Sequence, residues 1–201
     1  MPPVPTEFRT AGCRHQPRPS VVGMKTQTHP AEPQPTLFDR PVGLVRVPSP
    51  LGRLELASDG TAITGLQIER DGRLPRDGFR EASTDLLVRA AEQLSEYFDG
   101  TRERFDLPLA LEGTEFQRRI WTALSGVPFG ASRTYGQLGH DAGLAIAGRA
   151  VGGAVRSNPA PLLIPCHRAL ASGGRVVGYS QGAGIPTKRW LLEHEGIPYR
   201  A

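Results

Sequence analysis

The sequence predicts an α+β fold: a small N-terminal α/β domain with an antiparallel three-stranded sheet, followed by a helical C-terminal domain. Strand-like runs cluster between residues 42 and 68, a helical apolar pattern follows residue 84, and helical patterns dominate from residue 114. We therefore expect an α/β domain at 41–107 and a helical domain at 108–201, preceded by a disordered extension at 1–40.

The predicted extension is rich in proline. Residues 1–40 hold eight of the nineteen prolines and show little apolar periodicity, so they cannot offset the entropy cost of ordering. Cys13, His15 and His29 fit no standard zinc spacing and lack a fourth ligand, so we predict no metal. Without an apolar signal core or a long apolar run, the chain is expected in the cytosol, or in the nucleus of a eukaryote, and not in a membrane.

Three short runs predict the sheet. Val42–Val47 leads through a turn-rich connection to Leu54–Ser58, which alternates apolar and polar residues. Asp59-Gly60 is a strong tight-turn signal before the third run, Ala62–Ile68. We expect these three strands to form an antiparallel meander.

A helix follows a polar loop. Ser83 or Thr84 is a suitable N-cap, and Asp99-Gly100 ends the pattern. The apolar positions recur at helical spacing: Leu86, Leu87, Ala90, Leu94, Tyr97 and Phe98. Residues 108–113 are expected to link this domain to the next.

The second domain is predicted to begin with a helix capped by Thr114, with Gln117 completing a capping box. The patterns Thr134–Ala142 and Ala147–Ser157, separated by a break near Gly143, indicate a helix-turn-helix, although many helical domains contain such a pair. A glycine-rich stretch, Ser172–Gly184, precedes a last helix at Thr187–Glu195.

Charge is distributed unevenly. Residues 114–201 carry 10 Lys and Arg against 4 Asp and Glu, whereas residues 41–113 carry 9 against 13. A basic C-terminal half beside an acidic middle suggests a polyanionic partner for the basic half. Ordinary surface charge without a partner is the alternative.

Cys166 is the only cysteine of the predicted fold, and with only one other, Cys13, we expect a reducing compartment and no disulfide framework. A thiolate at neutral pH needs nearby positive charge, for which His167 and Arg168 are candidates. A lone cysteine is more often a buried structural residue.

The surrounding motif changes that balance. Ile164-Pro165-Cys166-His167-Arg168 matches completely the active-site signature of the O6-alkylguanine-DNA alkyltransferases. Gly148–Ala154 with Arg156–Pro159, Gly178–Ser180 and Trp190–Gly196 resemble this family's recognition helix with its asparagine hinge, its active-site loop and its closing helix. The resemblance covers nearly all of residues 108–198, is looser over 41–107 and is absent from 1–40. It implies a ribonuclease H-like first domain and a winged-helix-like second domain.

The resemblance also implies a reaction: irreversible, stoichiometric transfer of an alkyl group from guanine O6 in DNA to the Cys166 thiolate, without a cofactor. His167 would take the thiol proton through a water, and Glu195 would hold His167 in the right tautomer. Asn158 would tie the recognition helix to the cysteine loop, and Tyr135 would donate at guanine N3. The pocket would be lined by Tyr179, Ser180 and Pro161.

The implied partner is double-stranded DNA containing O6-alkylguanine. The damaged nucleotide must be flipped out of the duplex, and Arg149 resembles the family's arginine finger, which fills the gap. Ala150, Gly152 and Gly153 would let the helix approach the minor groove, with Arg156 on the same DNA-binding surface. We expect a monomer in solution. Repair of O4-alkylthymine and cooperativity on DNA are left open.

The sequence departs from the family pattern in places. Leu144-Ala145-Ile146 stands in the turn of the helix pair, Gly136 and Gly139 weaken the first helix of that pair, and Gln181 stands where a glycine is common. Two alternatives come from other classes of protein. A binding-only relative would keep the fold and replace the cysteine, which Cys166 argues against. A transcription regulator would usually have a polar recognition helix, whereas this one is small and apolar apart from Arg149 and Arg156.

Overall fold

The computed structural model describes residues 41–144 and 148–201. Three of the expectations concern residues outside these ranges. They are the disorder of residues 1–40, the Ala145-Ile146 part of the turn that departs from the family pattern, and Ala147 as the start of a helix.

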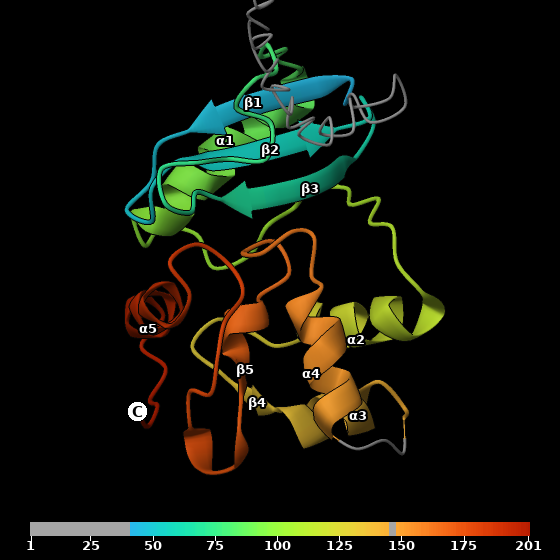
Figure 1. Cartoon of the computed structure of the whole chain (residues 1–201), viewed down its shortest axis with the longest axis vertical. Helices are drawn as coiled ribbons and strands as arrows, with labels where there is room; N and C mark the ends of the chain where they lie inside the picture. The colour runs from blue at the N-terminus through green and yellow to red at the C-terminus, as the bar shows by residue number, and fades with distance from the viewer. Residues whose placement is uncertain (1–40, 145–147) are drawn as a thin grey trace, which may run out of the picture. The chain divides into compact units, whose positions relative to one another are not determined.

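The predicted meander is confirmed. β1 (Gly43–Val47), β2 (Leu54–Ser58) and β3 (Ile63–Ile68) form an antiparallel sheet in the order β1-β2-β3 (Figure 1). Leu56 pairs with Val45 on one side and with Leu66 on the other. Strand β2 is buried along its whole length, because β1 and β3 flank both of its edges and α1 packs against it.

Helix α1 (Asp85–Phe98) packs against β1 and β2. Thr84 is its N-cap, since its side chain accepts a hydrogen bond from the Leu87 amide at 3.3 Å. Leu87 and Leu94 on its apolar face are fully buried against the sheet.

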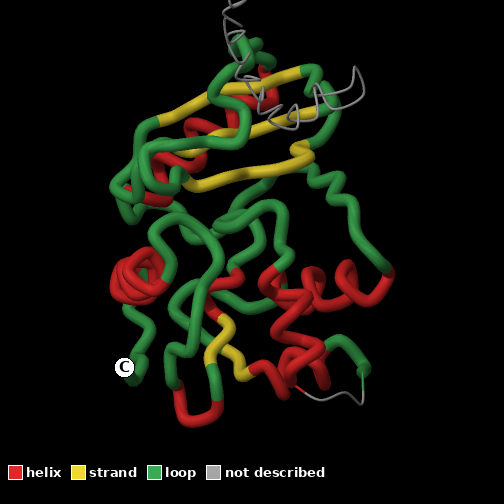
Figure 2. Tube along the Cα trace, in the orientation of Figure 1, coloured by secondary structure: helices red, strands yellow, loops and turns green. Residues whose placement is uncertain are grey.

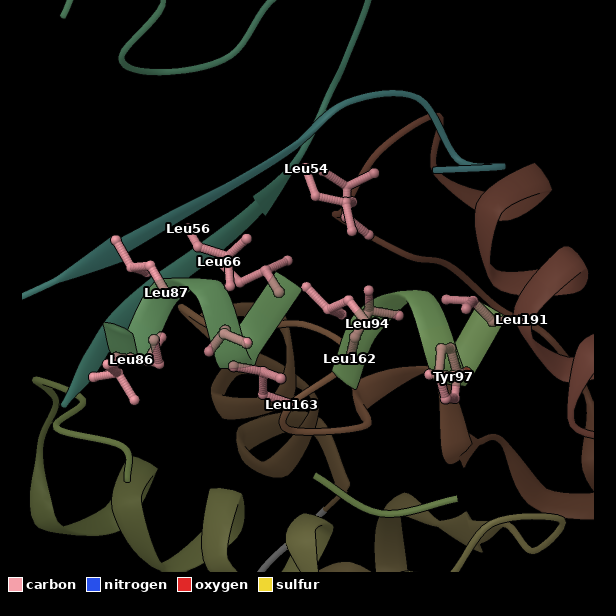
Figure 3. Packing of buried hydrophobic residues seen from close by; sticks show 14 residues of the cluster. Leu54, Leu56, Leu66, Leu86, Leu87, Leu94, Tyr97, Leu162, Leu163 and Leu191 are labelled. Carbon is pink, nitrogen blue, oxygen red and sulfur yellow. The ribbon is translucent and has the colours of Figure 1, made fainter. Parts of the chain in front are cut away.

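The core around α1 also contains residues from the second half of the chain. Leu162, Leu163 and Leu191 lie in the same apolar cluster as Leu94 and Tyr97 (Figure 3). The predicted linker forms backbone hydrogen bonds with β3. The Ile63 amide donates to the Pro108 carbonyl at 2.8 Å, and the Ala110 amide donates to the Ile63 carbonyl at 3.0 Å. The two halves therefore share one core, and this shared core positions the site described below.

The regular secondary structure of the second half is mainly helical, with long loops between the helices, as Figure 2 shows. Helices α2 (Glu115–Ser125) and α3 (Tyr135–Asp141) each begin with a complete capping box, and α4 (Gly148–Arg156) packs against both. The Trp121 indole donates to the Ala154 carbonyl at 2.8 Å, which fixes α4 on α2. The predicted α3–α4 pair is present.

Several short elements were not predicted. β4 (Arg133–Thr134) pairs in parallel with β5 (Ala169–Leu170), and two 3₁₀ turns, η2 (Cys166–Arg168) and η3 (Ser172–Gly174), lie between the asparagine hinge and the last helix.

The last helix, α5 (Ile185–His194), begins two residues earlier than predicted and ends one residue earlier, with Glu195 as its C-cap. Within residues 41–144 and 148–201, no helix is long and apolar enough to cross a membrane.

Candidate active site

Cys166 begins η2, is only 2% exposed, and borders a cavity of about 340 Å³. The β4–β5 pair assembles this cavity, because Tyr135 follows β4 directly and the cysteine turn directly precedes β5. The cavity is lined by Arg70, Tyr135, Gly152, Val155, Arg156, Cys166, Gly178, Tyr179, Ser180 and Lys188. The sequence-predicted residues Tyr135, Tyr179 and Ser180 thus meet Cys166 at one cavity.

Burial raises the pKa of the Cys166 thiol, and three neighbours oppose the shift. The Tyr179 hydroxyl lies 3.6 Å from Sγ, Asn158 contributes a hydrogen bond, and Lys188 contributes positive charge. Desolvation is the largest of these effects, so the resting group is the neutral thiol. A base is therefore needed to form the thiolate during the reaction.

The base nitrogen can be identified from hydrogen bonding. His167 is 0% exposed, and its Nε2 lies 2.8 Å from Oε1 of Glu195. The ionised carboxylate can only accept, so Nε2 carries the proton and Nδ1 holds the lone pair. Nδ1 is buried and has no hydrogen-bond partner among the described residues. Burial lowers the pKa of His167, so the imidazole is neutral at rest and able to take a proton.

Glu195 is a buried carboxylate, 3% exposed, and not the solvated helix-end residue that its position would suggest. Its Oε2 accepts from Arg168 Nε at 2.7 Å, and its Oε1 from Arg168 Nη2 at 2.9 Å and from the Tyr97 hydroxyl at 2.7 Å. Although burial opposes ionisation, the bonds from His167 and Arg168 lower the pKa of Glu195 to about 2. These bonds outweigh the unfavourable helix dipole at this end of α5. Arg168, which the sequence suggested as a positive charge near the thiolate, therefore forms its ion pair with Glu195.

Asn158 fixes the loop that carries the cysteine. Its buried amide nitrogen donates to the Ile164 carbonyl at 2.8 Å, and its oxygen accepts from the Ala160 amide at 3.0 Å. Between these contacts Leu162 has a φ of 73°, a left-handed conformation that is costly for a residue with a branched side chain. The Asn158 bonds and the burial of Leu162 in the shared core hold the loop in this shape.

The active-site loop is tied to the end of α4. Ser180 Oγ donates to the Arg156 carbonyl at 3.0 Å, and Gln181 Nε2 donates to the Asn158 carbonyl at 3.2 Å. Gln181 is not among the residues that line the cavity, so it anchors the loop without narrowing the pocket. Pro161 is buried in the loop that leads to the cysteine and does not line the cavity either.

The predicted DNA-binding residues lie on α4. Arg149, Ala150, Gly153 and Arg156 are exposed, and Gly152 is partly exposed and borders the cavity. The opposite face of the helix is buried through Val151, Ala154 and Val155. These residues belong to a separate apolar cluster within the second half, which also contains Ile120 and Leu124.

Sequence reasoning missed Lys188 and Tyr97. Lys188 is 1% exposed, donates to the Ala169 carbonyl at 2.5 Å and has its pKa lowered to about 8 by burial. One signal was available: only two of the 24 basic residues are lysines, and lysine, unlike arginine, can lose its charge when buried. Tyr97 was predicted only as a core position, and no sequence signal indicated a partner for its hydroxyl.

Within the described ranges, no group of three or more His, Cys, Asp or Glu side chains could hold a metal ion. The Cys13, His15 and His29 set lies outside those ranges. A buried cysteine at a cavity, followed by a histidine bonded to a carboxylate, is the residue set of proteins that use a cysteine nucleophile.

The comparisons with known proteins identify the family. Residues 46–111 match the model of the 6-O-methylguanine DNA methyltransferase ribonuclease-like domain, and residues 115–197 match that of its DNA-binding domain. The chain belongs to the O6-methylguanine DNA methyltransferase family, which confirms the resemblance and the fold class predicted from the sequence.

Curated relatives named methylated-DNA–protein-cysteine methyltransferase support this. The Haemophilus influenzae protein is 40% identical over 154 residues (76% of this chain and 85% of the relative), and the Mycobacterium bovis protein is 39% identical over 149 residues (74% and 89%). The crystal structure of Mycobacterium tuberculosis O6-methylguanine methyltransferase superposes with a TM-score of 0.68 at 37% identity, covering 77% of this chain and 92% of that one. A structure of that organism's protein in complex with DNA has a TM-score of 0.66 at 39% identity, covering 75% and 91%.

Substituting Glu195→Gln should destabilise the protein at pH 7, because Arg168 is left buried without its anionic partner. We expect the free energy of unfolding in urea to fall by about 3–5 kcal/mol. Because the pKa of Glu195 is lower in the folded than in the unfolded protein, its ionisation stabilises the fold above about pH 4.3. This contribution is lost as the pH falls toward about 2. The difference between wild type and variant should therefore shrink across that window.

The matched control is Glu193→Gln, which changes an exposed carboxylate on the same helix. It should lower the free energy of unfolding by under about 1 kcal/mol at pH 7 and throughout that window. Equal stability losses for the two variants at pH 7 would contradict the role given to the Glu195 cluster.

Proposed function

We propose that this chain is a methylated-DNA–protein-cysteine methyltransferase, which repairs O6-alkylguanine by moving the alkyl group onto Cys166 in a single turnover. The observation that carries the proposal is Cys166 in the wall of a cavity, followed by a buried His167 whose tautomer is set by Glu195. The relatives that share at least 36% identity over most of their length carry this activity in their names.

The chemistry follows from the resting state. His167 Nδ1 accepts the thiol proton, through the water that the family resemblance implies, and the thiolate attacks the saturated carbon on O6. The carbon–oxygen bond breaks as the sulfur–carbon bond forms, and its electron pair leaves on the guanine. Tyr135, which lines the cavity, would donate at N3 to improve the leaving group. In the balance, the cysteine exchanges its proton for the alkyl group, and guanine takes up the proton.

The lysine in the cavity assists the same step. Lys188 adds positive charge beside a thiolate that burial disfavours, and it lies 5.9 Å from the centre of the Tyr179 ring. Tyr179 in turn can donate its hydroxyl proton to the sulfur once the thiolate forms. Both contacts become stronger when the sulfur is charged, which lowers the barrier to proton transfer.

The reaction should end with the first alkyl group. A thioether does not hydrolyse, and Cys166 is the only free cysteine among the described residues. No neighbouring thiol in that part of the chain can therefore release the product, so each molecule is consumed.

The exposed face of α4 supports DNA binding. A Cβ placed on Gly152 or Gly153 would meet nothing within 4 Å, so packing inside this protein does not require glycine there. Each glycine costs the helix about 1 kcal/mol relative to alanine. Close approach of a DNA backbone explains this cost, with Arg149 as the residue that fills the gap left by a flipped nucleotide.

The remaining expectations rest on the resemblance. They are minor-groove binding to double-stranded DNA and a monomer in solution. The cytosolic or nuclear location and the division into 41–107 and 108–201 are expected from the sequence patterns instead. The binding-only alternative requires a replaced cysteine, and Cys166 is present at the cavity.

Mixing the protein with a duplex that contains O6-methylguanine should add one methyl group to the peptide carrying Cys166, as read by mass spectrometry. Cys166→Ser should bind the duplex and gain no methyl group. Binding without transfer by the wild type would favour the binding-only alternative, and methylation of another residue would refute the assignment of Cys166.

Replacing Arg149 by alanine should slow single-turnover repair in duplex DNA by on the order of 10- to 100-fold, because unstacking the base costs a few kcal/mol. Repair in single strands should slow much less, since no stack has to be filled. Arg118→Ala, which removes an exposed arginine from α2, is the charge-matched control and should affect both substrates alike. Equal slowing by Arg149→Ala in duplex and single strands would contradict the finger role.

A further inference from the structure

The Tyr97 hydroxyl reaches the active-site carboxylate from the other half of the chain. Tyr97 lies in the last turn of α1, which packs on the sheet, and its hydroxyl donates to Glu195 Oε1 at 2.7 Å. The two residues are 1% and 3% exposed. Figure 3 shows Tyr97 at the end of α1 next to Leu191 of α5.

Glu195 Oε1 is the oxygen that also meets His167. It receives three contacts: Tyr97 at 2.7 Å, His167 Nε2 at 2.8 Å and Arg168 Nη2 at 2.9 Å. The second oxygen accepts only from Arg168 Nε. Tyr97 and His167 therefore share one acceptor atom, so the position and basicity of that atom depend on both.

The tyrosine ring is held rigidly. It packs edge-on against Phe98 and His194 with centroid distances of 5.3 and 5.0 Å, and it is tilted against Phe105 at 5.4 Å. The Tyr97 carbonyl also lies 2.8 Å from His194 Nε2. These contacts fix the hydroxyl without any rearrangement at the site.

Tyr97 remains a neutral donor. Burial and the charge of Glu195 raise its pKa far above its ordinary value, so it cannot supply a proton to the reaction. The charged groups that face His167 are Glu195, Arg168 and Lys188. Tyr97 is the uncharged member of this set of contacts and can act only through the orientation and basicity of Glu195.

We propose that Tyr97 is a positioning residue for alkyl transfer: its bond to Glu195 Oε1 limits how strongly that oxygen attracts the His167 proton and holds the carboxylate in line with the imidazole. The inference rests on the proposed function. It makes the sheet-bearing half of the chain a contributor to the active site.

The test compares Tyr97→Phe with Tyr199→Phe. Tyr199→Phe is the matched control, because the Tyr199 hydroxyl donates at 2.6 Å to Glu193, an exposed carboxylate outside the site. Phenylalanine keeps the ring contacts of Tyr97 and removes only the hydroxyl. The pH dependence of single-turnover methyl transfer and the melting temperature are measured for both variants.

Without the Tyr97 hydroxyl, Glu195 Oε1 becomes a stronger acceptor and stabilises the doubly protonated imidazole of His167 more strongly. We expect the acid limb of the rate profile to move to higher pH by about one unit, a 10-fold change in the proton affinity of His167. Tyr199→Phe should leave the limb at the wild-type position. A residue that only packs would lower the melting temperature and leave the limb where it is, and that result for Tyr97→Phe would overturn the proposal.

A second readout needs no DNA. The rate at which iodoacetamide alkylates Cys166, followed by mass spectrometry of its peptide, also falls when His167 is already protonated. The same shift of its acid limb is expected in Tyr97→Phe. If the wild type transfers no methyl group, the proposed function fails, while this reaction still decides whether Tyr97 acts on the Cys166–His167 pair.

Discussion

A single buried carboxylate organises this protein. Glu195 caps the C-terminal end of α5, where the helix dipole disfavours negative charge, and it is almost completely buried. It is stable there because Arg168 binds both of its oxygens while His167 and Tyr97 bind one. Because the carboxylate is thereby kept ionised, it can only accept, and this fixes which nitrogen of His167 is the base.

The same cluster also joins the two halves of the chain. Tyr97 belongs to the helix that covers the sheet, whereas His167, Arg168 and Glu195 belong to the second half. Leu162 and Leu191 carry the apolar contact across the boundary. Separating the halves would expose this core and remove one donor from the carboxylate, so the sheet-bearing half contributes to the chemistry as well as to stability.

Local rules made much of this predictable. The strands, the caps at Thr84 and Thr114 and the cysteine motif follow from short patterns whose physical cause lies within a few residues. The β4–β5 pair and the Tyr97 bond could not be found this way, because each depends on contacts between residues far apart in sequence. The rarity of lysine singles out Lys188 but does not reveal its contact with the Ala169 carbonyl. Arg168 was only a candidate cation for the thiolate, and adjacency to Cys166 does not reveal that its guanidinium binds Glu195.

Cys166 and His167 are both neutral at rest, with the histidine proton on Nε2. Nitrogen-15 NMR of the imidazole at neutral pH tests this directly, because protonated and unprotonated ring nitrogens have well-separated shifts. We predict that Nε2, which is hydrogen-bonded to Glu195, carries the only proton and that Nδ1 is unprotonated. A proton on Nδ1 alone, or on both nitrogens in the resting protein, would contradict the account.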